Sequence, residues 1–135
     1  MKLKDTITLE VIDLPNDLLW TDEFDWSPVE STQTFSLTGA LIIEYGEKQA
    51  GRPISLSADQ DMAWVTRETL SKLKAWAAIP ARKFNLIFEY ENDVRQFLVV
   101  FNHSKDATKG SPVLGFPMHN DGDDFTCALN FMEVV

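Results

Sequence analysis

The densest group of potentially reactive side chains lies near the C-terminus. His119, Asp121, Asp123 and Asp124 follow one another within a short polar stretch. Carboxylates supply the oxygen ligands that hard divalent cations prefer, and a histidine beside them can act as a base in hydrolysis. However, the aspartates lack the spacing of a calcium loop, and Asp121-Gly122 is a strong turn-forming pair. We therefore expect a solvated acidic turn, with Asp121, Asp123 and Asp124 as a weak metal candidate and a hydrolytic site as the less favoured alternative.

Other potentially reactive residues are isolated. His103 has no serine or cysteine nucleophile in a recognisable motif nearby. Cys127 is the only cysteine, which excludes an internal disulfide and a cysteine-based zinc site and suits a small buried apolar residue. The six glycines are scattered and match no phosphate-binding loop. The sequence thus predicts a protein that is not an enzyme and uses no cofactor.

Aromatic and acidic side chains alternate between residues 20 and 26. If this segment is a strand, Trp20, Phe24 and Trp26 lie on one face. Aromatic residues flanked by acids suit a protein interface, whereas aromatic platforms for nucleic-acid bases are normally accompanied by basic residues. We therefore expect Trp20, Phe24 and Trp26 to act as docking anchors, with Arg52 as a polar contact. The alternative is that these aromatics complete the core of an ordinary edge strand.

Hydrophobic periodicity predicts the elements that position these residues. One amphipathic helix is expected over about 66–78, with Thr66 as its N-cap and Leu73 on its apolar face. The apolar run over 40–45 predicts a buried strand, and 84–90 with 94–101 predicts an antiparallel hairpin at the centre of the core. Alternating patterns predict further strands over 7–12, 18–26 and 52–57, and two more strands are expected over the β-branched and polar stretch 32–37 and the last stretch, 125–134. The expected fold is mainly β: an antiparallel split β-barrel or sandwich of about seven or eight strands with one helix.

Length and composition favour a single domain over residues 1–135, divided into an acidic N-terminal segment, 1–31, and a β-barrel and helix body, 32–135. No apolar stretch resembles a membrane span or a signal peptide, so a cytoplasmic protein without membrane contact is expected. The net charge of −9 disfavours specific nucleic-acid binding.

The charge is unevenly distributed along the chain. Residues 1–47 contain two lysines and ten acids, a net charge of −8, whereas residues 48–109 contain ten basic and seven acidic residues, a net charge of +3. If these stretches lie on different faces, the molecule is a dipole that favours head-to-tail contact with copies of itself. The alternative is that the acidic loops only keep the protein soluble.

Three motifs resemble small structural proteins of tailed-bacteriophage and prophage tail modules. They are Thr38–Gly46, Gly51–Leu56 and Trp64–Arg67, followed by Leu70, Leu73 and Pro80, and a looser likeness covers residues 32–135. Many such proteins share a split β-barrel flanked by one helix and assemble as rings. The resemblance therefore implies a subunit of the tail tip or baseplate.

Together these observations predict a non-enzymatic tail protein that acts by self-assembly. Its expected partners are other tail proteins and copies of itself, arranged for example as a ring, with assembly in the cytoplasm and a final place in the virion tail. The alternative is a small-ligand or carbohydrate-binding β module, because barrels hold ligands in their mouths and tryptophan is a good platform for sugars.

Overall fold

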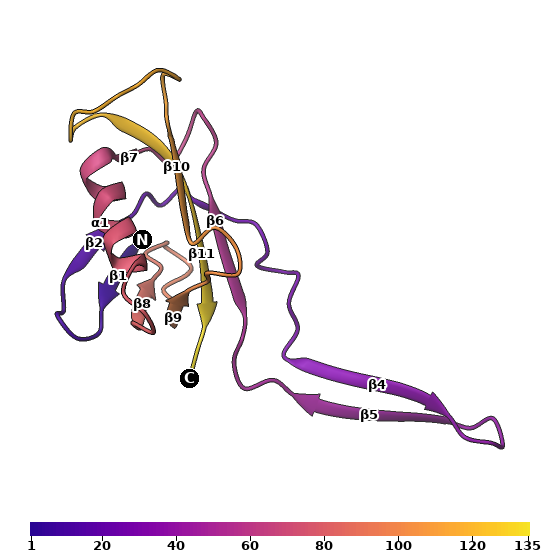
Figure 1. Ribbon diagram of the computed structural model, residues 1–135. Coiled ribbons are helices and arrows are strands. Elements are labelled where there is room, and N and C mark those ends of the chain that lie inside the picture. The colour runs from indigo at the N-terminus through magenta and orange to yellow at the C-terminus, as the bar shows by residue number, and fades with distance from the viewer.

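Eleven strands and one helix make up the chain, which the computed structural model describes over residues 1–135 (Figure 1). Several strands are only two to five residues long, which explains why there are more than the seven or eight expected. In chain order the elements are β1 (Lys2–Asp5), β2 (Val11–Asp13), β3 (Leu19–Trp20), β4 (Val29–Phe35), β5 (Leu41–Glu47), β6 (Pro53–Ser57), β7 (Val65–Thr66), α1 (Arg67–Ala77), β8 (Phe84–Ile87), β9 (Gln96–Phe101), β10 (Thr108–Pro112) and β11 (Asp124–Glu133).

Nine of the strands form one antiparallel sheet. Its order is β2-β1-β8-β9-β11-β6-β3, and the long strand β11 also pairs with β7 and β10. The sheet ends at β2 and β3 and is not closed. The remaining two strands, β4 and β5, form a separate sheet. The predicted fold class, mainly antiparallel β with one helix in a split barrel or sandwich, is confirmed.

The β8–β9 hairpin lies at the centre of the core, as its sequence predicts. Phe84 pairs with Val99 and Leu86 with Phe97, and the side chains of Phe84, Leu86 and Val99 are fully buried. The sheet curls, because Trp20 of β3 stacks on Phe88 with ring centroids 5.4 Å apart although three strands separate β3 from β8 in the sheet order. This curl encloses the core.

The helix closes one side of the core. The side chain of Thr66 accepts a hydrogen bond from the backbone N–H of Thr69 at 3.3 Å, so Thr66 is the N-cap of α1, as predicted. Leu73 and Trp76 are buried, and Trp76 stacks on Phe84 with ring centroids 5.1 Å apart. The predicted helix and its apolar face are confirmed. No helix of the chain is both long and apolar enough to cross a membrane.

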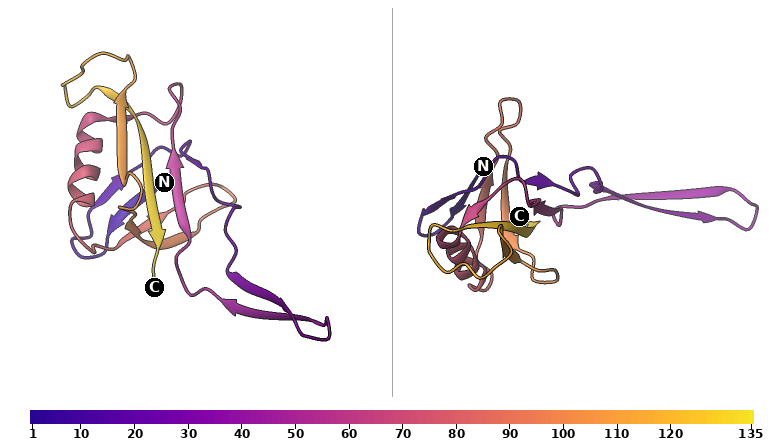
Figure 2. Two further views of the ribbon diagram at one scale, coloured as in Figure 1. Left: turned by 45° about the vertical axis from the view of Figure 1, so that its right-hand side comes forward. Right: turned by 90° about the horizontal axis from the view of Figure 1, so that it is seen from above.

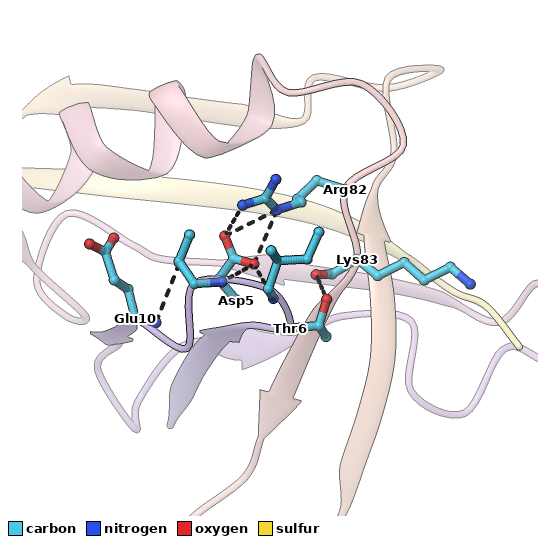
Figure 3. Close-up of polar contacts among 7 residues, drawn as sticks. Asp5, Thr6, Glu10, Arg82 and Lys83 are labelled. Atoms are coloured by element: carbon cyan, nitrogen blue, oxygen red, sulfur yellow. Dashed lines mark hydrogen bonds and ion pairs between the residues drawn. The ribbon is translucent and has the colours of Figure 1, made fainter.

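The N-terminal strand differs from the prediction. Residues 6–10 form the turn between β1 and β2 instead of a strand over 7–12, and Ile7 and Leu9 are exposed. The reason is Asp5, whose buried carboxylate accepts hydrogen bonds from the backbone N–H groups of Ile7 and Thr8 and turns the chain (Figure 3). Arg82 binds the same carboxylate from the opposite side, at 3.0 Å.

The strands β4 and β5 extend away from the body (Figures 1 and 2). They pair only with each other, and every residue in them is exposed. The prediction of a buried strand over 40–45 is therefore wrong, because an apolar run reveals a strand but not whether its faces are covered. The division expected at residue 31 falls inside β4, and residues 1–20 belong to the main sheet.

Candidate interaction site: the hairpin arm and its base

The projecting hairpin of residues 29–47, here called the arm, is amphipathic. Directly opposed residues of an antiparallel pair share a face, and successive pairs alternate between faces. The register pairs Phe35 with Leu41, Gln33 with Ile43, Ser31 with Tyr45 and Val29 with Glu47 on one face. The other face carries mostly polar groups, Glu30, Thr32, Thr34, Glu44 and Gly46, with Ile42 the exception. The face that carries Val29, Phe35, Leu41, Ile43 and Tyr45 is here called the apolar face of the arm.

The apolar face has no partner within the chain. Phe35 is 75% exposed and Tyr45 72% exposed, and Val29, Leu41 and Ile43 are exposed as well. Both outer edges of the arm also lack a strand partner. An isolated two-stranded hairpin is only marginally stable in water. Within this chain, the arm is thus supported only by the pairing of its own two strands and by the contacts at its base.

The tip of the arm is a tight, hydrogen-bonded turn. The backbone carbonyl of Ser36 accepts a hydrogen bond from the N–H of Gly39 at 2.9 Å, and its side chain accepts one from the N–H of Ala40 at 3.1 Å. Gly39 has a φ of 84°, which glycine adopts without strain. These bonds keep the two strands in register and place Leu37 in solvent at the tip.

Trp26 has two cations close to its ring at the base of the arm. The Lys48 ammonium lies 5.6 Å from the Trp26 ring centroid, and the Arg52 guanidinium lies 5.7 Å from it. Lys48 also forms an ion pair with Glu30 at 3.2 Å. Such cation–π contacts contribute about 0.5–1 kcal/mol each at exposed sites. They join the segment before the arm to the segment after it.

Arg52 also connects this base to the core. Its guanidinium lies 4.6 Å from the ring centroid of Trp20, and its Nη2 donates a hydrogen bond to the backbone carbonyl of Glu23 at 2.8 Å. Its Nε is buried and has no hydrogen-bond partner. The planar guanidinium can stack on aromatic rings while it donates hydrogen bonds in its own plane. Arg52 thereby fixes the point at which the arm leaves the body.

A second guanidinium supports Trp20 from the β9 side. Arg95 lies 5.3 Å from the Trp20 ring centroid and forms ion pairs with Asp93 at 2.7 Å and Glu23 at 2.5 Å. Hydrogen bonds to Asp93 and then Glu23 raise the pKa of Arg95 above its ordinary value, and the bond to Arg95 lowers the pKa of Asp93. The ion pairs hold the loop after β3 against the body.

The four residues predicted as an interface have different surroundings. Trp20 is 8% exposed and belongs to the core, so the alternative interpretation as a core aromatic describes it better than that of a docking anchor. Only Leu19–Trp20 of the expected strand over 18–26 is a strand, because the next residues turn. Trp26 is half-buried at the base of the arm, and Phe24 is 92% exposed. The structure brings Trp20, Trp26 and Arg52 together and leaves Phe24 apart.

The acidic turn near the C-terminus is structural. The backbone carbonyls of Asp123 and Asp121 accept hydrogen bonds from the first N–H groups of α1, those of Arg67 at 2.9 Å and Glu68 at 3.2 Å. The carboxylate of Asp123 accepts a bond from the N–H of Asn120. No three His, Cys, Asp or Glu side chains gather as a metal-ligand set, and this includes the weak candidates Asp121, Asp123 and Asp124.

Cys127 is buried in β11, as predicted. Burial raises the pKa of its thiol to about 11. The thiol therefore stays protonated at neutral pH, and the thiolate that would act as a nucleophile is scarce.

The arm itself was the feature that sequence analysis missed. A signal for it is present, because 29–35 and 41–47 are two strand-like stretches of equal length around the turn residues Thr38-Gly39, and neither contains Lys or Arg. Comparison of the chain with protein-family models, curated proteins and solved structures gave no match.

Proposed function

We propose that this protein is a non-enzymatic structural subunit of a bacteriophage or prophage tail that assembles by docking its arm on a neighbouring subunit. The observation that carries the proposal is the apolar face of the arm, which no part of the chain covers. The tail assignment itself draws on the sequence resemblance described above.

Covering the apolar face is the driving force for docking. Each of its five large apolar side chains contributes about 1 kcal/mol when a partner removes its remaining exposed surface from water. Docking also restores the lateral support that an isolated hairpin lacks. An exposed apolar patch rimmed by polar residues is typical of a protein interaction surface.

The shape of the molecule favours repeated contacts. The arm leaves the body on one side only (Figure 2). A contact between the arm of one copy and the body of the next is heterologous, because the two surfaces differ. Heterologous contacts generate rings when the rotation closes and filaments when it does not, and either suits a tail subunit.

The carbohydrate-binding alternative depends on an accessible aromatic platform. Trp20 is buried against Phe88 and Arg52 and offers none. Trp64 is half-exposed and is the one exposed tryptophan that the alternative could use, with its indole N–H bonded to the carbonyl of Gln60 at 2.7 Å. Ligand binding also gives the arm no role, so self-assembly is the favoured function.

The test is the mass of the protein by light scattering over a wide concentration range. The wild type is expected to form discrete oligomers as its concentration rises. The double variant Phe35→Ser with Ile43→Ser is expected to stay monomeric, and its melting temperature should equal that of the wild type. The matched control, Thr32→Ser with Thr34→Ser on the opposite face, should assemble normally. A wild type that remains monomeric up to about 1 mM, where even about 4 kcal/mol of binding would be visible, overturns self-assembly.

A further inference from the structure

A shallow groove runs along the outer side of α1. It has a volume of about 450 Å³ and is formed by Arg67, Leu70, Ser71, Lys74, Ala75, Ala78 and Phe125. The helical members recur at three- and four-residue spacing, so they form one continuous stripe beside the start of β11. The floor is apolar, and a cation lies towards each end.

The cations at this groove have no carboxylate partners. Neither Arg67 nor Lys74 forms an ion pair, although Lys2, Lys48, Arg82 and Arg95 each have one elsewhere. Arg67 donates to the carbonyl of Met118 and lies 5.8 Å from the Phe125 ring centroid. Lys74 is exposed. The groove therefore combines uncovered apolar surface with unneutralised positive charge.

The arm has the complementary properties. Residues 29–47 contain three acids and no Lys or Arg, a net charge of −3. Of the three acids, Glu30 pairs with Lys48, and Glu44 lies on the polar face. Glu47 is the carboxylate that shares the apolar face, where it opposes Val29, and it forms no ion pair. The apolar face thus presents hydrophobic side chains together with one unneutralised negative charge.

We infer that the α1 groove receives the apolar face of the arm from a second copy of this chain, with Glu47 of that arm beside Lys74. The inference rests on the proposed self-assembly and specifies the surface on which the arm docks. Apolar side chains of the arm cover Leu70, Ala75 and Ala78, and the opposite charges select the orientation.

The occupant is a second copy because the arm cannot reach the groove of its own chain. The arm and α1 lie on opposite sides of the body in every view (Figures 1 and 2). A donor surface on one side and an acceptor surface on the other produce a head-to-tail contact, which continues from copy to copy. The seven-residue strands of the arm span about 23 Å, which is enough to cover the full length of the eleven-residue helix, about 16 Å.

Charge reversal tests the contact. Lys74→Glu places two carboxylates together and should weaken self-association about tenfold or more, as measured by light scattering. Combining it with Glu47→Lys in the same chain restores the opposite charges and should restore association. Ala75→Glu, at an exposed position on the floor of the groove, is a second variant that should also weaken association.

Two matched controls carry the same charge changes on other surfaces. The first control is Lys109→Glu on β10. Successive residues of a strand point to opposite faces, and the adjacent Gly110 faces Leu70 of α1, so Lys109 faces away from the helix. Glu44→Lys lies on the polar face of the arm. Both should assemble as the wild type does, and circular dichroism should show that all variants fold.

The outcomes separate the two proposals. If the groove variants assemble normally while Phe35→Ser with Ile43→Ser is monomeric, the arm docks elsewhere and the inference is overturned, but self-assembly stands. If Lys74→Glu disrupts association and Glu47→Lys does not rescue it, the pairing of Glu47 with Lys74 is likewise overturned. A wild type that never associates overturns the proposed self-assembly, and the inference falls with it.

Discussion

At the scale of single residues, a buried ion pair joins Asp5 to Arg82. Asp5 is 1% exposed, and its carboxylate accepts hydrogen bonds from both Nε and Nη2 of Arg82 at 3.0–3.2 Å (Figure 3). The pair fixes the β1–β2 turn to the segment between α1 and β8. Burying a charge is costly unless it is paired, so the two residues depend on each other.

Removing Arg82 leaves a buried carboxylate without its counter-ion. We expect Arg82→Ala to lower the free energy of unfolding by about 3 kcal/mol, as measured by urea denaturation. The neighbouring substitution Lys83→Ala is the control, because the Lys83 side chain contacts only the carbonyl of Val135 at the C-terminus. If Arg82→Ala and Lys83→Ala lowered the free energy of unfolding by the same amount, water would be replacing the guanidinium as the partner of Asp5.

The same pair predicts a loss of stability in acid. The hydrogen bonds from Arg82, followed by those from the backbone of Ile7 and Thr8, lower the pKa of Asp5 to about 2, below the 3.8 of an unperturbed aspartate. Because the folded state holds this proton less tightly than the unfolded state, the stabilisation is complete above about pH 4 and disappears as the pH falls towards 2.

Asp5→Asn tests this pH dependence. The variant should be less stable than the wild type at neutral pH, and its stability should change less between pH 4 and pH 2, as followed by urea denaturation at each pH. The lowered pKa values of Glu89 and Asp93 leave some slope in the variant. If the free energy of unfolding fell equally with pH in the wild type and in Asp5→Asn, Asp5 would not be the source of the acid sensitivity.

Residue-level expectations succeeded where local chemistry decides the outcome. Thr66 caps the helix, as predicted, because a cap depends only on adjacent residues. Cys127 is buried, as predicted, because a single cysteine in an apolar strand packs as a small apolar residue. The sequence left open whether Trp20 is a docking anchor or a core aromatic, because its burial depends on Phe88 and Arg95, which are distant in sequence. The turn at Ile7 was missed because it depends on the buried carboxylate of Asp5.

At the scale of elements, the base determines how firmly the arm is held. Trp26, before the arm, contacts Lys48 and Arg52, which both follow the arm, and Arg52 also bonds to the body. Without the indole ring, the arm keeps its own backbone hydrogen bonds but loses part of its attachment. The arm should then open more often, since local opening follows the number of supporting contacts.

Trp26→Ala should therefore make the arm more sensitive to proteolysis without unfolding the body. We expect cleavage within residues 29–47 to accelerate several-fold while the melting temperature of the body changes little. Phe24→Ala is the control, because that side chain is already 92% exposed. Equal cleavage rates for the variant and the wild type would show that the cation–π contacts do not hold the arm.

Sequence predicted the elements better than their surroundings. The helix, the β8–β9 hairpin and the long last strand agree with their patterns, because periodicity and short turns act locally. Residues 40–45 were correctly expected to be a strand but not to project into solvent. An apolar run has the same sequence signature whether its own chain or another molecule covers it.

At the scale of the whole molecule, acidic and basic surfaces lie apart. The arm carries a net charge of −3, and the α1 groove on the opposite side carries Arg67 and Lys74 without ion-pair partners. The arm holds −3 of the net charge of −8 in residues 1–47, and the remaining −5 lies in residues 1–28, before the arm. The proposed head-to-tail association would bring the opposite charges of the arm and the groove together, so it should respond to salt.

Raising the salt concentration should weaken self-association without abolishing it. The Debye length falls from about 10 Å at 0.1 M to about 3 Å at 1 M, which screens attraction between the acidic arm and the basic groove. Burial of the apolar face is not screened and persists. Light scattering at the two salt concentrations should therefore show smaller oligomers at 1 M, and the double variant Glu47→Lys with Lys74→Glu should retain the same salt response. Association that strengthens with salt would mean that apolar burial alone drives assembly and that charge complementarity plays no part in it.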